Sequence, residues 1–191
     1  MRLEPLAESH VPALSAIGLD SELWTFTLSS VRTPDDMRRY VETALAEQAC
    51  GTALPFVQIA VATGEVVGST RLASYEPVHR RVEIGWTWLA RAWQRTGINT
   101  EAKRLLMAHA FNVVGVERVE LKTSARNARS RAAIARIGGV EEGILRRHMV
   151  NDRGEPRDTV YFSVLRDEWP AVRAALDARL AGPGARNSEP D

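Results

Sequence analysis

The sequence predicts one mixed α/β domain, and three observations support this prediction. Segments with alternating apolar residues, typical of strands, interchange with segments of helical apolar spacing. Turn-rich connections create strand pairs near both ends of the chain, around a strand–helix–strand–helix unit in the middle. The 191 residues are 45% hydrophobic and 26% charged, which suffices for one compact core, and no break in composition marks a second domain.

The first third of the chain is predicted to contain helices and a hairpin. Residues 33–49 carry the clearest helix signals, because Thr33 suits the N-cap, Pro34 suits the first helical position and acidic residues follow. The other elements expected here are a strand at 2–6, a short helix at 8–19, and a hairpin of residues 55–62 and 65–74.

The middle of the chain is predicted to form a half-buried strand and an amphipathic helix. Residues 81–90 alternate strictly, so one face is expected to carry Val82, Ile84, Trp86 and Trp88, and the other Glu83, Gly85 and Thr87. The helix expected at 98–114 has a predicted buried stripe of Ala102, Leu105, Leu106, Ala110 and Val113. His109 lies on this stripe, which predicts a buried histidine of the core.

The last third is predicted to repeat the alternation of strands and helices. The expected elements are a strand at 116–125, a helix at 127–139 closed by Gly138 and Gly139, a hairpin of residues 143–150 and 157–165, and a helix at 167–180. Residues 1–181 would then form the single domain, and residues 182–191, with little apolar content, a disordered tail.

Composition and charge exclude several classes of function. The formal net charge is +1, so no overall field attracts the chain to nucleic acid or to an anionic membrane. Cys50 is the only cysteine, which excludes an internal disulfide and a multi-cysteine metal site and leaves it as an ordinary small residue. The first residues lack the apolar segment of a secretory signal, and no apolar run reaches about 18 residues, so we expect a cytoplasmic protein without a membrane partner.

A candidate anion site lies in "WQRTGINTEAKRLL", residues 93–106. Gly97 is expected to permit a backbone conformation that bulkier residues resist, and the first N–H groups of the helix that follows lack partners within the helix. These groups and the helix dipole favour an anion, although an ordinary strand-to-helix turn is an equal alternative. The stretch lacks the Gly-Lys-Ser/Thr of a P-loop and the spaced glycines of a dinucleotide fingerprint.

This stretch resembles motif A of the GNAT superfamily of acyl-CoA N-acyltransferases. Gln94 and Gly97 match the motif and Asn99 departs from it, while "NTEA" and "NARSRAAIARIGGVEEGILR" look like the branch that acetylates ribosomal-protein alanine termini. The resemblance extends from residue 2 to about residue 175. It implies a central, mostly antiparallel sheet of about seven strands with a splayed central pair and flanking helices. It also implies acetyl-CoA as co-substrate, no metal, and direct transfer to a primary amine without an acyl-enzyme.

The resemblance also implies where acetyl-CoA binds. Its pyrophosphate would contact the backbone N–H groups from Arg95 to Thr100, and backbone N–H groups near Trp88 and Leu89 would polarise its carbonyl oxygen. In the family, the asparagine of Asn-x-x-Ser contacts the pantetheine arm or an ordered water. The implied cofactor-binding residues are Trp88, Leu89, Gln94, Arg95, Thr96, Gly97, Ile98, Asn99, Thr100, Asn127 and Ser130.

Ser130 is the first candidate for protonating the leaving thiolate. It shares a helix face with Ala133, Ile134 and Ile137, so its hydroxyl is expected to point inward, and the family places such a serine near the sulfur. The alternative is structural: Asn127 caps the helix and Ser130 bonds back to it.

Glu83 is the first candidate for the general base, because the family often carries a glutamate on this strand; a solvated or hydrogen-bonded strand acid is the alternative. Tyr161 could donate to the sulfur or line the acceptor site, although a structural hydrogen bond is its simpler role. Asp158 and His148 are alternative bases, and Asp158 alternates with Val160 and is expected to be partly buried with a raised pKa.

The sequence leaves the acceptor amine open. A peptide α-amino group, a spermine-like amine, an amino acid and an aminoglycoside all suit the same fold, because acceptor loops vary. A non-catalytic acyl-CoA sensor would need the loop at 94–100 without Ser130 or Glu83, and a plain interaction domain would use the tryptophans as contact surface. A homodimer is also left open.

Overall fold

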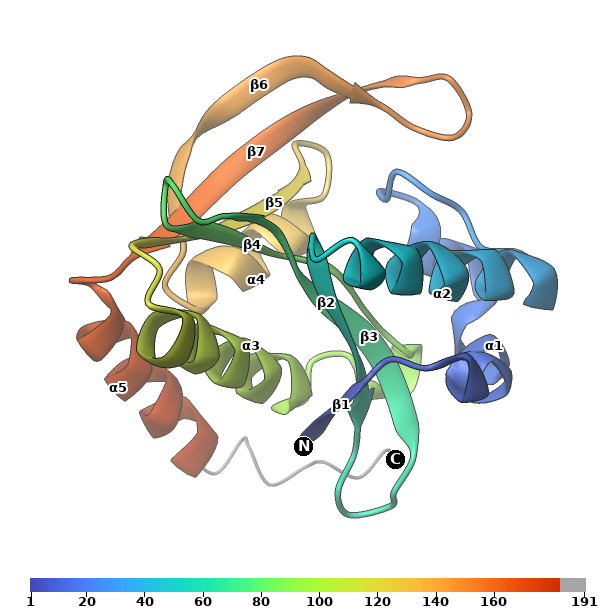
Figure 1. The fold of residues 1–191 in the computed structure, drawn as a ribbon, viewed down its shortest axis with the longest axis horizontal. Coiled ribbons are helices and arrows are strands. Elements are labelled where there is room, and N and C mark those ends of the chain that lie inside the picture. The colour runs from blue at the N-terminus through green and yellow to red at the C-terminus, as the bar shows by residue number, and fades with distance from the viewer. Residues whose placement is uncertain (183–191) are drawn as a thin grey trace.

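The computed structural model describes residues 1–182, so the tail predicted from residue 182 lies almost entirely outside the described residues (Figure 1). The strands are β1 Arg2–Pro5, β2 Ala53–Ile59, β3 Val66–Glu76, β4 Arg81–Leu89, β5 Arg118–Ser124, β6 Val140–Val150 and β7 Pro156–Leu165. The main helices are α1 Val11–Gly18, α2 Pro34–Ala49, α3 Ile98–His109, α4 Ala128–Arg136 and α5 Trp169–Ala181.

The strands form one seven-stranded sheet in the order β1-β2-β3-β4-β5-β7-β6. Every neighbouring pair is antiparallel except β4 and β5. These two pair in parallel over only three residues, Arg81–Glu83 against Arg118–Glu120, and then diverge. The divergence leaves one edge of β4 open in the middle of the sheet.

Helices cover both faces of the sheet. Side chains of β4, β5 and β7 such as Ile84 and Phe162 pack with α3 and α5 in one apolar cluster. On the opposite face, α1 and α2 cover the β1–β3 side through a second cluster that includes Leu14 and Val41. Figure 1 shows the β6–β7 hairpin arching beyond these helices, at the edge of the sheet.

The start of α2 agrees with its sequence signals. The Thr33 side chain accepts a hydrogen bond from the Asp36 N–H at 3.1 Å, the Asp36 side chain bonds back to Thr33 N–H, and Pro34 begins the helix. Cys50 is the exposed C-cap residue at the other end. Here local chemistry alone was sufficient to predict the element.

The strict alternation predicted for β4 is wrong beyond Gly85. From Arg71 to Ser69, β3 advances by two residues, while the partner β4 advances by three, from Gly85 to Trp88. The extra residue forms a β-bulge, and Trp86 adopts a left-handed φ of 48°. Because one extra residue exchanges the faces, Val82 and Ile84 pack on the α3 side, whereas Trp88 packs on the α2 side and Trp86 is 41% exposed.

The buried stripe predicted for the helix after the anion loop is also displaced. Ala102, Leu106 and Ala110 are buried as expected, but Val113 and His109 are exposed. Lys103 and Met107 are buried instead. The apolar pattern did not predict this, because lysine is almost always assigned to the surface. The last turn, Ala110–Val114, is π-helical and ends at Gly115, which has a φ of 79°.

Candidate functional site

The loop before α3 presents a row of unused backbone donors. Within residues 1–182, the N–H groups of Arg95, Thr96, Gly97, Asn99 and Thr100 donate no hydrogen bond to the rest of the described chain. They lie together at the positive end of a helix whose first regular bond runs from Glu101 N–H to the Gly97 carbonyl at 2.9 Å. This arrangement suits a phosphate or pyrophosphate group.

The backbone conformation of this loop differs from the expectation for Gly97. Gly97 is the N-cap residue with ordinary right-handed angles, φ −67° and ψ −15°, which any residue can adopt. The left-handed residue is Arg95, with a φ of 67°. The backbone angles therefore do not require a glycine at position 97.

Gln94 connects the anion loop to its two neighbours. Its Nε2 donates to the Leu89 carbonyl at the end of β4 (3.0 Å), and its Oε1 accepts from Arg129 Nη1 of α4 (2.8 Å). The Thr96 hydroxyl also donates to the Trp93 carbonyl at 2.8 Å. One amide thus holds the loop, the open strand and α4 in a fixed relation.

The open edge of β4 supplies further donors. Ala90 N–H bonds to the Val67 carbonyl of β3 at 2.9 Å, and backbone groups alternate in direction along an antiparallel strand. The Leu89 N–H therefore points away from β3, toward the divergence from β5, whereas the Trp88 N–H points to β3. Of the two residues predicted to polarise a carbonyl, only Leu89 has its N–H on the open side.

Glu83, Lys122 and Tyr161 come together on one face of the sheet. Lys122 Nζ lies 2.8 Å from Glu83 Oε2 and 4.7 Å from the centre of the Tyr161 ring. Burial acts to lower the pKa of Lys122, but the hydrogen bond and charge of Glu83 outweigh it, so this pKa lies above its usual value. Glu83, 9% exposed, is therefore a hydrogen-bonded carboxylate rather than a solvated one, an arrangement that fits both a base and the hydrogen-bonded strand acid of the structural alternative.

A network of charges that sequence reasoning missed extends from this cluster. Glu120 accepts hydrogen bonds from Arg81 (3.1 Å) and Arg118 (3.0 Å), and Lys122 approaches it at 3.8 Å. Arg118 also pairs with Glu142, and this bond lowers the pKa of Glu142 to about 2. Side chains at alternate positions of adjacent strands produce such a network, which is visible only once the strand register is known.

Arg157 of β7 is a second residue that the sequence did not indicate. Its guanidinium makes two long hydrogen bonds of 3.4 Å, to the Phe26 carbonyl and to the Thr159 hydroxyl, and its Nε has no partner among the described residues. Burial lowers the pKa of Arg157, and the charge of Glu83 partly offsets this effect. The side chain thus joins the segment before α2 to the face that carries Glu83.

The predicted pair at the start of α4 has the geometry of a helix cap. Asn127 Oδ1 accepts from Ser130 N–H at 3.0 Å, as the structural alternative required. Ser130 is half-buried, and its hydroxyl makes no hydrogen bond with another of residues 1–182. No hydrogen bond within that range joins Ser130 to Glu83 or Tyr161, whereas Lys122 contacts both Glu83 and Tyr161, so the three candidate catalytic residues form two groups.

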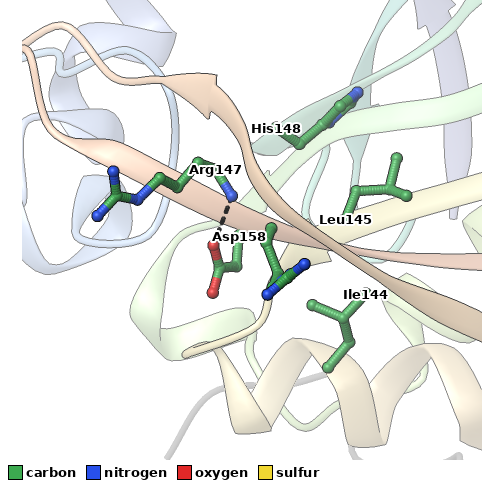
Figure 2. A pocket seen from close by; sticks show the side chains of 6 residues that line it. Ile144, Leu145, Arg147, His148 and Asp158 are labelled. Carbon is green, nitrogen blue, oxygen red and sulfur yellow. Dashed lines mark hydrogen bonds between the residues drawn. The ribbon is translucent and has the colours of Figure 1, made fainter.

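The two alternative bases line an open hollow of about 840 Å³ on the β6–β7 hairpin, together with Ile144, Leu145, Arg146 and Arg147. Figure 2 shows the Asp158 carboxylate accepting from Arg147 N–H, at 2.6 Å, where β6 bulges. Asp158 is exposed, contrary to prediction, although Val160, two residues further along β7, lies in the apolar cluster. His148 packs edge-to-face on Tyr161, with ring centres 5.5 Å apart.

No group of three or more His, Cys, Asp or Glu side chains in residues 1–182 is arranged to hold a metal ion. None of the helices in that range combines the length and the apolar character needed to cross a membrane.

Comparison with protein families and curated proteins identifies relatives of this chain. Residues 1–140 match a family described as "Acetyltransferase (GNAT) domain". Over 106 residues the chain is 37% identical to a protein of Bacillus subtilis (strain 168) named "Putative ribosomal N-acetyltransferase YdaF", and the match covers 56% of this chain and 57% of that protein. The chain thus spans less than two-thirds of the curated relatives that it matches.

Solved structures have the same fold. A GCN5-related N-acetyltransferase from Brucella melitensis is 32% identical with a TM-score of 0.88, covering 99% of this chain and 88% of its own. Mycobacterium smegmatis RimJ, in complex with CoA-disulfide, is 27% identical with a TM-score of 0.78, covering 93% and 88%. The predicted fold class and the predicted resemblance are both confirmed. The chain belongs to the GNAT acetyltransferase family.

Proposed function

We propose that this protein is an N-acetyltransferase that moves an acetyl group from acetyl-CoA to a primary amine by direct attack in a ternary complex. The observation that carries the proposal is the row of free N–H groups before α3, next to the open edge of β4. An anion held at the loop would direct the rest of a long thioester substrate along the divergence of β4 and β5. The polar face with Glu83 lies at the same divergence.

The residues of the chain divide the work of binding acetyl-CoA. Backbone donors from Arg95 to Thr100 would hold the pyrophosphate, with Gln94 fixing the loop that presents them. The Leu89 N–H would polarise the thioester carbonyl from the open edge of β4. Asn127, whose Oδ1 caps α4, retains an amide NH₂ for the pantetheine arm.

Acetyl transfer also needs a neutral amine and a proton for the leaving thiolate. Glu83 would accept the proton of the attacking amine, and the 2.8 Å contact with Lys122 Nζ holds its carboxylate in place. Ser130 or Tyr161 would protonate the thiolate. Tyr161 lies beside Glu83 and Lys122, whereas the Ser130 hydroxyl is free at the start of α4.

The acceptor class is proposed from the relatives. The name of the B. subtilis relative refers to ribosomal N-acetylation, so a protein or peptide N-terminus is the first acceptor to test, followed by small-molecule amines. An α-amine has a pKa of roughly 7.7 to 8.0 and is partly neutral near pH 7.5, which suits a site whose base is held in an ion pair.

A non-catalytic acyl-CoA-binding module is the alternative. The Glu83–Lys122 ion pair favours it, because a carboxylate already paired with an ammonium is less available to accept a proton from a substrate amine. Thiol release from acetyl-CoA, measured across a panel of peptides, polyamines, amino acids and aminoglycosides with mass spectrometry of the products, separates the two functions. An enzyme releases thiol in step with an acetylated amine, whereas a sensor binds acetyl-CoA and releases none.

A further inference from the structure

Lys103 is a buried amine in the second turn of α3, and it faces the sheet. It is 5% exposed, and no carboxylate of residues 1–182 lies within 4.0 Å of its Nζ. The Nζ donates to the hydroxyls of Thr87 on β4 and, at 3.4 Å, of Thr70 on β3. Burial lowers the pKa of Lys103 to about 7, but the ammonium and the neutral amine can both donate these bonds. A buried lysine without a counter-ion is costly, so its position calls for a cause.

The two threonines transmit this contact to the β-bulge. Their hydroxyls lie 2.8 Å apart, so one donates to the other, and the hydroxyl whose proton stays free donates to the Gly85 carbonyl, which lies 3.4 Å from Thr70 Oγ1 and 3.3 Å from Thr87 Oγ1. Gly85 is the last regularly paired residue of β4 before the extra residue. The chain of contacts therefore runs from α3 through two hydroxyls to one peptide group of β4.

The bulge is also held from the opposite face of the sheet. The Arg71 guanidinium lies 5.3 Å from the Trp86 ring and 4.8 Å from the Tyr40 ring, and the Tyr40 hydroxyl donates to the Trp86 carbonyl at 3.4 Å. A φ of 48° is strained for a bulky aromatic residue and persists only where surrounding contacts fix it. Contacts from both faces supply that restraint.

The direction of the Gly85–Trp86 peptide decides where the bulge presents its backbone N–H group. The carbonyl and the N–H of a trans peptide point in opposite directions. Because the Gly85 carbonyl is held toward β3 and α3, the Trp86 N–H turns toward the open edge of β4, where β5 has diverged. This donor shares the open edge with the Leu89 N–H.

We propose that Lys103 is a positioning residue that, through Thr87 and Thr70, fixes the bulge of β4 and so aims its backbone donors at the reacting thioester. Lys103 thereby connects the helix whose first turn binds the anion to the strand that contacts the reacting carbonyl. This inference rests on the proposed acetyl transfer. It assigns Lys103 no contact with substrate.

Lys103→Met keeps the length and apolar stem of the side chain but removes its donors, and Thr87→Val removes the next link. Because a donor displaced by about 1 Å can cost on the order of 100-fold, we expect each variant to lose about 10- to 100-fold in kcat. The KM for acetyl-CoA should change little, since the anion loop is intact. Thr87→Ser, which keeps the hydroxyl, should stay within about threefold of wild type, and Lys103→Met with Thr87→Val should be no worse than either alone.

The experiment measures thiol release with the best amine of the panel, at a temperature where circular dichroism shows every variant folded. Met107→Leu, a core change one turn along α3, controls for general loosening of the helix and should retain wild-type kcat. Unchanged kcat in folded Lys103→Met, an equal loss in Met107→Leu, or additive losses in the double variant would overturn the positioning role. If Lys103→Met does not fold, the Thr87→Val and Thr87→Ser pair decides in the same way. No release by wild type would instead overturn the proposed function, and the role of Lys103 with it.

Discussion

Glu83 illustrates how single residues of this site depend on partners from other strands. Its carboxylate lies 2.8 Å from Lys122 Nζ and is 9% exposed, so its chemistry is set by a lysine 39 positions away in sequence. The sequence identified Glu83 and Tyr161 by position on their strands, but it could not identify Lys122 or Arg157. Their roles arise from cross-strand pairing, which depends on a register that no local pattern encodes.

The effect on kcat/KM of removing the base should depend on pH. We expect Glu83→Gln to lower kcat/KM most at low pH, where an α-amine acceptor with a pKa of roughly 7.7 to 8.0 is protonated, and to recover partly as pH rises. The measurement is a pH–rate profile of the variant beside wild type. Glu117→Gln, at a half-buried glutamate paired with Arg80 and Arg166, is the matched control and should follow wild type. A Glu83→Gln profile parallel to that of wild type would exclude Glu83 as base.

Protonation of the thiolate should affect turnover rather than binding. We expect Ser130→Ala to lower kcat by about 100-fold, the low end of general-acid effects, because a CoA thiol is a tolerable leaving group. The KM for acetyl-CoA should stay near wild type, since the contact forms mainly in the transition state. Steady-state kinetics beside a direct acetyl-CoA titration measure both quantities. Full turnover in Ser130→Ala would show that Ser130 only takes part in the helix cap, and Tyr161→Phe would be measured next.

Lys103 also predicts how stability depends on pH. Its pKa is about 7 in the folded protein and 10.5 when unperturbed, so between these values the unfolded chain binds more protons. The free energy of unfolding should therefore rise as pH increases from about 7 to 10, by at most about 1.4 kcal/mol per pH unit. Urea denaturation at several pH values measures this slope. Lys103→Met should remove the rise, and a slope unchanged in that variant would show that other groups cause it.

At the scale of elements, the sequence predicts where a helix or strand begins and ends better than it predicts which of its faces is buried. Thr33 and Pro34 place the start of α2 because capping is local chemistry. The bulge in β4 was missed because a local pattern does not contain the contacts from other elements, such as that of the Thr70 hydroxyl of β3 with the Gly85 carbonyl. Lys103 displaced the predicted stripe of α3, since a pattern that keeps charges outside cannot place one inside.

The anion loop makes a prediction of its own. Gly97→Val should fold, because residue 97 has ordinary helical angles, but its branched side chain would stand beside the free N–H groups and weaken acetyl-CoA binding at least tenfold. Arg95→Gly keeps the donor and suits the φ of 67°, so it should weaken binding less. Ala92→Val adds similar bulk at an exposed position outside the row of donors and serves as control. Calorimetric titration with acetyl-CoA measures all three, and a folded Gly97→Val protein with wild-type affinity would place the anion elsewhere.

At the scale of the whole molecule, the count of strands and helices followed from periodicity, but their order in the sheet did not. β7 lies between β5 and β6, and the single parallel pair, β4 with β5, is what opens the sheet. Pairing between strands far apart in the sequence cannot be predicted from any short segment of it. The resemblance implied the splayed central pair, and the structure shows it. The cytoplasmic location and any homodimer remain predictions from the sequence.

We propose that the protein transfers acetyl from acetyl-CoA to an amine, using the row of N–H groups, the open edge of β4 and the face around Glu83. The most direct measurement is thiol release from acetyl-CoA by the wild-type protein across the amine panel, with mass spectrometry of every product. We expect amine-dependent release matched by one acetylated product, and a lower rate of both in Gly97→Val, whose affinity for acetyl-CoA is reduced. Calorimetric binding of acetyl-CoA with no amine-dependent release from any member of the panel would contradict it.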